Sequence, residues 1–165
     1  NQTSILVAVE HREAHQRSAG RGVKSAANES GVNNLIYVPY GVLMLAVVLI
    51  YAPRSVVGRE MAKQEGGYNN NDPRAQQASL TGIGKRALNA HNNALEALPI
   101  FGLGVLAAMQ RSTNIKAIAV LSLVFAFARV AYLLLYLRDQ AQIRSICWGI
   151  GLLASLGLYG LAVVG

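Results

Sequence analysis

Four apolar segments limit what this chain can fold into. Each is about as long as a helix must be to cross the hydrocarbon core of a bilayer. Of the 165 residues, 53% are hydrophobic and only 14% are charged, a composition typical of an integral membrane protein. We therefore predict an all-α integral membrane protein that places a four-transmembrane-helix bundle in the lipid bilayer. The predicted helices comprise residues 35–51, 86–109, 115–137 and 143–164.

A polar extension, residues 1–33, precedes the membrane domain predicted for residues 34–165. Within it, His11 and His15 have the i, i+4 spacing of some zinc sites. Arg12 follows His11, however, where the pattern His-Glu-x-x-His requires glutamate. We therefore predict no metal site.

The connection between the first two predicted helices is long and rich in turn-forming residues. Residues 52–54, Ala-Pro-Arg, mark the exit from the first helix, because proline removes a backbone donor. Residues 66–73, Gly-Gly-Tyr-Asn-Asn-Asn-Asp-Pro, are expected to be irregular. Such loops tend to be functional, and this one would lie on the same face as Arg86 and Arg144, where it could cover a site.

The distribution of charge predicts the orientation of the bundle. The formal net charge is +7. By the positive-inside tendency, the long first loop is cytoplasmic and both termini lie on the non-cytoplasmic side of a bacterial inner membrane or a eukaryotic organelle membrane. No basic stripe alternates with aromatic residues, so no nucleic-acid binding is predicted. Eight cations lie on the loop side, Arg54, Arg59, Lys63, Arg74, Lys85, Arg86, Arg138 and Arg144, against six on the other, Arg12, Arg17, Arg21, Lys24, Arg111 and Lys116.

A polar stretch opens the second predicted helix. Four of its polar residues follow one another at offsets of 0, +3, +7 and +10, which places them on one side of an α-helix. Charged and amide groups are costly to keep at the mouth of a membrane-spanning helix. We interpret them as a binding site first and as packing second. They are Arg86, Asn89, Asn93 and Glu96.

A second polar cluster lies in the third predicted helix. Arg129, Tyr132 and Tyr136 are separated by 3 and 4 residues, which puts one cation and two phenols on a single face. Arg129 lies about 12 Å inside its span, judged by the helical rise. It needs a partner, and Glu96 is the only acid within the predicted spans. The two side chains either pair to fix the bundle or stand beside a ligand site, and one role does not exclude the other.

Arg144 and Ser145, at the turn into the last helix, complete a pattern that resembles the MAPEG family. These are the membrane-associated proteins of eicosanoid and glutathione metabolism. The resemblance covers about residues 35–164 and is closest to the bacterial-type branch. It rests on Arg86-Ala-x-x-Ala-His-x-Asn93-x-x-Glu96-x-x-Pro99-x-Phe101, on Arg129-Val-Ala-Tyr132-x-x-x-Tyr136 and on Arg144-Ser145.

The resemblance implies a homotrimer of four-helix subunits, with glutathione bound between neighbouring subunits near the cytoplasmic face. Asn93 and Glu96 would hold the polar groups of the tripeptide. Arg144 or Ser145 would lie near its sulfur as catalytic residues, since a cation favours the thiolate, which is the nucleophilic form. The residues implied for glutathione binding are Arg86, Asn93, Glu96, Arg129, Tyr132 and Tyr136.

Two functions agree with this pattern. The first is a glutathione-dependent transferase or peroxidase that acts on hydrophobic electrophiles entering from the lipid, and we expect this one. The second is a non-catalytic accessory or structural subunit of a larger membrane complex, docked to other membrane subunits through the N-terminal extension. Retention of Asn93 and Glu96 favours the enzyme. Asn89 and Asn92 favour the accessory subunit, because eukaryotic glutathione-using members carry further arginines there.

Overall fold

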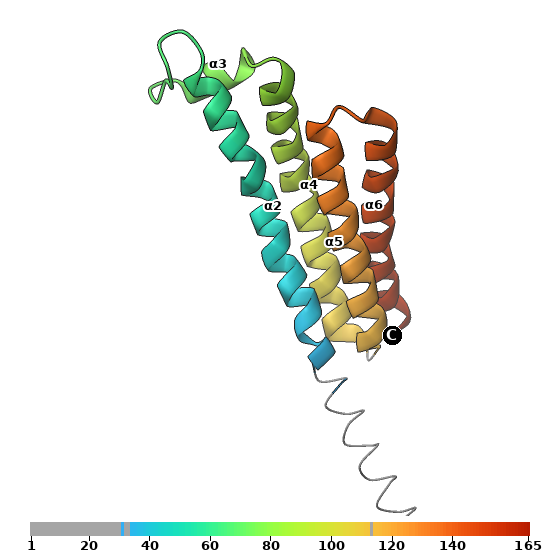
Figure 1. The fold of residues 1–165 in the computed structure, drawn as a ribbon. Coiled ribbons are helices and arrows are strands. Elements are labelled where there is room, and N and C mark those ends of the chain that lie inside the picture. Colours follow the sequence, from blue (N-terminus) through green and yellow to red (C-terminus); the bar gives the residue numbers. More distant parts are fainter. Residues whose placement is uncertain (1–30, 32–33, 113) are drawn as a thin grey trace, which may run out of the picture. The chain divides into compact units, whose positions relative to one another are not determined.

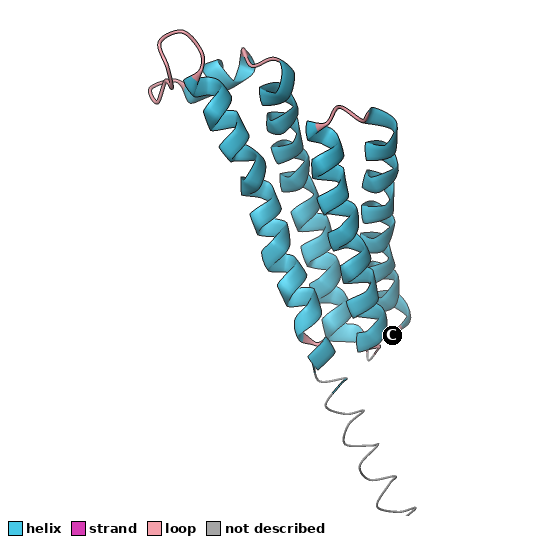
Figure 2. Ribbon diagram, in the orientation of Figure 1, coloured by secondary structure: helices cyan, strands magenta, loops and turns pink. Residues whose placement is uncertain are grey.

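The described part of the protein is a bundle of membrane-spanning helices. The structure, a computed structural model, describes residues 31, 34–112 and 114–165, of which residues 37–165 form one compact unit. Four of its helices are long and apolar enough to cross a membrane, which confirms the predicted fold class. The predicted extension, residues 1–33, lies outside the described residues apart from Gly31. The helices are α2 (Tyr37–Ala62), α3 (Pro73–Ala78), α4 (Gly82–Arg111), α5 (Ile115–Leu137) and α6 (Ala141–Val164) (Figures 1 and 2).

Helix α2 is longer than predicted, because Pro53 does not end it. The expected end at residue 51 is wrong: the helix runs on to Ala62 with Pro53 buried inside it. A proline in a helix weakens the hydrogen bonding of the carbonyl groups in the preceding turn. His91 of α4 contacts this turn, where its Nδ1 lies 2.7 Å from the Ile50 carbonyl oxygen. A neighbouring helix that supplies such a partner lets a proline remain inside a membrane helix.

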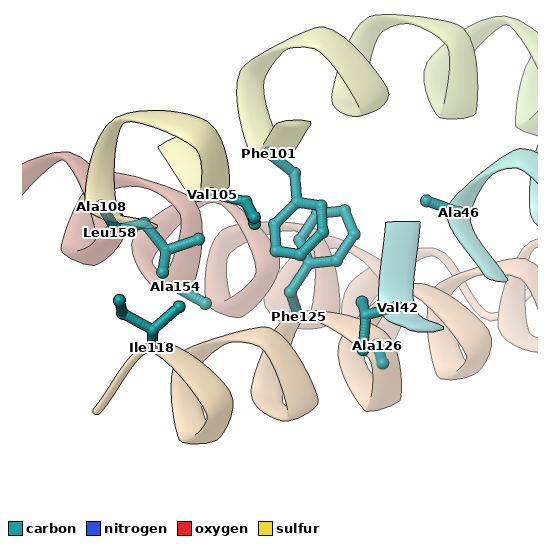
Figure 3. Close-up of a cluster of buried hydrophobic side chains, with 10 residues drawn as sticks. All are labelled: Val42, Ala46, Phe101, Val105, Ala108, Ile118, Phe125, Ala126, Ala154 and Leu158. Carbon is teal, nitrogen blue, oxygen red and sulfur yellow. The ribbon is translucent and has the colours of Figure 1, made fainter. Parts of the chain in front are cut away.

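The four long helices surround a single apolar core. Helix α2 packs against α4 and α5, and α6 also packs against α4 and α5, whereas α2 and α6 make no contact within the described chain. The rings of Phe101 and Phe125 stack at the centre, with 3.8 Å between their centroids (Figure 3). The buried residues of this core are Val42, Ala46, Phe101, Val105, Ala108, Ile118, Phe125, Ala126, Ala154 and Leu158.

Helices α4 and α6 approach closely at Gly104. A Cβ atom placed on Gly104 would lie 3.1 Å from the ring of Tyr159 and 3.2 Å from the carbonyl oxygen of Ser155. The Tyr159 hydroxyl donates to the carbonyl oxygen of Ile100, at 2.9 Å. Small residues permit this kind of close packing in membranes, where association depends on contact and hydrogen bonding rather than on water.

Helices α2 and α4 extend past the turn between α5 and α6 and carry α3 beyond it (Figure 1). We call this part, residues 57–87, the headpiece, and the end of the bundle that bears it the loop end. The headpiece has its own small core of Val57, Met61, Leu80 and Ala87. The Gln76 side chain ties the connection together by donating to the carbonyl oxygens of Met61 and Gly67, at 3.1 and 2.8 Å.

The connection is irregular over residues 63–72, as expected, but a short helix then begins at Pro73. The Asp72 side chain accepts a hydrogen bond from the backbone N–H of Ala75, at 3.2 Å. An acidic N-cap followed by proline in the first turn is a helix-start signal. The sequence therefore held an indication of α3 within what was interpreted as a turn.

Candidate functional site

A cavity lies between α4, α5 and α6 and combines a few polar groups with apolar walls. Its empty volume is about 400 Å³, within the range of small-molecule sites. Three of the predicted site residues, Asn93, Glu96 and Arg129, line it together although they come from two helices. The full lining consists of Asn93, Glu96, Ala97, Ile100, Phe125, Arg129, Trp148, Gly151, Leu152 and Ser155.

Asn93 and Glu96 act as a pair on α4, one helical turn apart. The Asn93 amide Nδ2 donates to Glu96 Oε2 at 3.3 Å, which orients the amide. The Asn93 Oδ1 atom is buried and accepts no hydrogen bond from any described residue. A buried acceptor without a donor is costly. The pair therefore presents an unused acceptor and a carboxylate.

Arg129 is buried in α5, with only 6% of its surface exposed. Its guanidinium lies over the ring of Tyr132, 4.5 Å from the centroid, which is a favourable cation–π contact. Of the two alternatives stated for Arg129 and Glu96, the direct ion pair is not formed: the ion pairs among the described residues are Lys63–Glu60 and Arg86–Asp139. Arg129 and Glu96 thus share the cavity while neither neutralises the other at contact distance.

The polar face of α5 continues from the cavity to the loop end. The rings of Tyr132 and Tyr136 meet edge to face, with centroids 5.4 Å apart. The turn after α5 brings Arg144 of α6 over Tyr136, 4.1 Å from the ring centroid. Arg129, Tyr132, Tyr136 and Arg144 form a continuous series of cation and ring contacts, which we call the cation–aromatic ladder. The spacing of 3 and 4 residues in α5 indicated the first three of these neighbours.

Two predicted site residues lie apart from both the cavity and the cation–aromatic ladder. Arg86 makes an ion pair with Asp139, at 3.3 Å between Nη1 and Oδ2, and its Nε donates to the Leu137 carbonyl oxygen at 3.3 Å. It joins α4 to the end of α5 instead of facing Asn93. Ser145 is exposed, and its hydroxyl donates to the carbonyl oxygen of Ala141 in its own helix, at 3.0 Å.

The α6 wall of the cavity was not predicted from the sequence. Trp148, Gly151 and Ser155 line the cavity, yet only Arg144 and Ser145 were expected from this helix. The signal that could have found them is helical periodicity. Positions 144, 148, 151 and 155 recur every three or four residues and therefore share one face.

Comparison with known proteins identifies the family. The sequence model of the MAPEG family matches residues 38–164, which include all four long helices except the first residue of α2. Comparison with curated proteins and comparison with solved structures each found no match. The matched region contains the cavity and the cation–aromatic ladder. The chain therefore belongs to the MAPEG family.

Proposed function

We propose that the protein is a glutathione-dependent transferase or peroxidase acting on hydrophobic electrophiles at the membrane. The observation that carries this proposal is the set of unused polar groups at one end of an otherwise apolar cavity. Among the described residues, Asn93 Oδ1 has no donor, and neither Arg129 nor Glu96 forms an ion pair. Ionisable groups inside a membrane bundle are expensive and mark functional sites.

The groups present fit glutathione, with which MAPEG proteins are generally associated. Glutathione offers an ammonium group, two carboxylates and peptide N–H donors. Glu96 suits the ammonium group, and Asn93 Oδ1 suits an N–H donor. Arg129 and Arg144 suit the carboxylates, because a guanidinium matches a carboxylate with two parallel hydrogen bonds.

Each residue then has a definable role. Bound glutathione would supply a thiol whose thiolate form attacks an electrophilic carbon or reduces a peroxide. Arg144, held over Tyr136 at 4.1 Å, places a fixed positive charge near the loop end and favours the anionic form of a neighbouring group. Apolar walls around the polar end exclude water and strengthen these electrostatic interactions.

Binding and turnover by the purified full-length protein test the proposal. Calorimetry with glutathione, together with conjugation to chlorodinitrobenzene, would compare the wild type with Arg144→Ala. Losing one charge-assisted contact is expected to reduce kcat/KM about tenfold or more. Arg138→Ala is the matched control, because this cation is exposed at the same turn and lies outside the ladder. No binding at millimolar glutathione would refute the enzyme, and an Arg144→Ala variant as active as wild type would refute this placement of the site.

The second candidate function is an accessory subunit of a larger membrane complex. Its support is that Asn89 and Asn92 are exposed on α4 while Arg86 is engaged by Asp139, so fewer cations face the cavity than the family pattern implies. Co-purification with a fixed set of other membrane subunits, combined with absence of glutathione binding, would favour this function over the first.

A homotrimer is the assembly we propose. In the single chain, Glu96 lines the cavity and is exposed at its open side in a membrane-spanning helix, where contact with lipid would be costly. A neighbouring copy packed against this side of α4 would cover the carboxylate and enclose the site. Native mass spectrometry is expected to give three chains per particle, and a monomer would contradict the proposal.

The orientation we propose places the loop end in the cytoplasm. Described cations that support it include Arg59, Lys85 and Arg138, which are exposed at this end, and positive charge favours the cytoplasmic side. A cysteine introduced at Asn70, in the exposed connection, should react with an impermeant reagent only when the cytoplasmic side is open. Reaction from the opposite side would reverse the orientation.

A further inference from the structure

We propose that Arg86 and Asp139 are a positioning pair that holds the start of α6 and thereby fixes the place of Arg144. As far as Arg144 contacts glutathione, the inference rests on the proposed function. As far as the pair fixes the turn between α5 and α6, it rests only on contacts among the described residues.

The residue that ends α5 has a backbone conformation that favours glycine. Asp139 has a φ of 63°, in the left-handed region where a side chain is usually strained. Its N–H donates to the Tyr136 carbonyl oxygen at 3.2 Å, and the N–H of Gln140 donates to the Leu135 carbonyl oxygen at 2.9 Å. These two bonds are the pattern with which a left-handed residue closes a helix. Glycine would form the same turn with less strain, so the turn alone does not explain a carboxylate at this position.

The contact of this carboxylate with Arg86 does explain it. Nη1 of Arg86 lies 3.3 Å from Oδ2 of Asp139, and Nε of the same guanidinium donates to the Leu137 carbonyl oxygen at 3.3 Å. A positive charge at the carboxyl end of a helix is itself favourable. One cation from the start of α4 therefore contacts both the end of α5 and the residue at which the chain turns toward α6.

The start of α6 depends on this contact because its own cap is weak. Gln140, the N-cap residue, makes no side-chain capping hydrogen bond, and glutamine is not among the preferred N-cap residues. Gln140 directly follows Asp139, and its carbonyl oxygen accepts the backbone N–H of Arg144 at 3.1 Å. A shift of the turn would therefore move Arg144, whose guanidinium lies 4.1 Å from the ring centroid of Tyr136. Small displacements of a binding group reduce its contribution strongly.

Asp139→Gly separates a positioning role from a role in the turn alone. Glycine suits the left-handed backbone, and the ion pair that is lost is mostly exposed on the Asp139 side, where 69% of the side chain is accessible. The melting temperature should therefore stay close to that of the wild type. Glutathione affinity, measured by calorimetry on the full-length protein in lipid nanodiscs, should nevertheless fall about three- to fivefold. A residue that serves the turn alone would leave both quantities unchanged.

Arg86→Gln, alone and combined with Asp139→Gly, tests whether the two residues act as a unit. If they do, the double variant should lose no more glutathione affinity than Arg86→Gln alone. Lys85→Gln is the matched control, because Lys85 is an exposed cation next to Arg86 that forms no ion pair with a described residue, and it should bind as the wild type does. Additive losses in the double variant, or an equal loss in Lys85→Gln, would overturn the inference.

Hydrogen exchange without ligand separates this outcome from that of the proposed function. The backbone amides of residues 144–147, in the first hydrogen-bonded turn of α6, should exchange about three- to fivefold faster in Asp139→Gly than in the wild type. They should exchange at the wild-type rate in Lys85→Gln. Faster exchange in a protein that does not bind glutathione would support the pair as the restraint on α6 and refute only the proposed function. Glutathione binding by the wild type, with exchange and affinity unchanged in Asp139→Gly, would overturn this inference alone.

Discussion

The Gly104→Val variant is expected to lose most of its folded, monodisperse protein in detergent. A Cβ atom at this position lies within 3.3 Å of Tyr159, the Ser155 backbone and Leu158 together, and valine adds two further carbon atoms. The backbone oxygen cannot move aside as a flexible side chain would. Overpacking of this kind costs about 1–3 kcal/mol and sometimes more, and separating α4 from α6 would also strain the hydrogen bond from Tyr159 to Ile100.

Size-exclusion chromatography and thermal unfolding would measure this loss. Gly160→Val is the control, since it places the same side chain on α6 where a Cβ atom meets nothing within 4 Å of the single chain. The packing argument would be wrong if Gly104→Val melted at the wild-type temperature. If both variants failed equally, position 160 would be a contact between subunits.

Replacing Arg129 by methionine should change stability and binding in opposite directions. Arg129 is buried, its guanidinium makes no ion pair with a described residue, and it lies over the ring of Tyr132. Exchange of a buried charge for an apolar side chain of similar size is often neutral or stabilising, by about 1–4 kcal/mol. Glutathione binding should fall sharply, because the cation that would meet a carboxylate is gone.

Thermal unfolding without ligand and calorimetry with glutathione would test the pair of effects in one preparation. If Arg129 serves mainly to hold the bundle together, Arg129→Met will instead lower the melting temperature. A variant that is both more stable and still binds glutathione would remove Arg129 from the site. Glu96→Gln is a second variant for the same two measurements, because it keeps the shape of the side chain and its contact with Asn93 and removes only the negative charge.

The length of the hydrophobic segments was sufficient to predict the membrane fold, because a bilayer permits few structures in which every backbone N–H and C=O group of a spanning segment is hydrogen-bonded. It was not sufficient to place the end of α2. Pro53 signals a helix end when the chain is considered alone, whereas in the bundle it is buried inside α2 and His91 of α4 contacts the Ile50 carbonyl in the preceding turn. That contact joins residues 41 positions apart, so no local pattern contains it.

Helical periodicity predicted site residues that lie along one helix, but it did not predict the contacts that form between helices. Asn93, Glu96 and Arg129 line the cavity as expected. Arg86 shares their helix face by spacing, yet Asp139, which has a left-handed backbone conformation with φ of 63°, draws it away to the turn. Trp148, Gly151 and Ser155 line the cavity from α6, and a pattern within one helix does not reveal which neighbouring helix it faces.

Side-chain packing in the headpiece and in the membrane-spanning part of the bundle depends on different environments, water for the first and lipid for the second. In the orientation proposed above, the cluster of Val57, Met61, Leu80 and Ala87, against which Leu137 of α5 packs, would lie at the aqueous end of the spans, where its burial would be driven by water, with the temperature and urea dependence that this entails. The spans below it gain nothing from that effect, because lipid is as apolar as their own side chains. Helices α2 and α4 therefore each have one part whose packing depends on water and another part whose packing depends on lipid. Urea can loosen the headpiece while the spans hold, and a change in bilayer thickness acts on the spans while the headpiece stays folded.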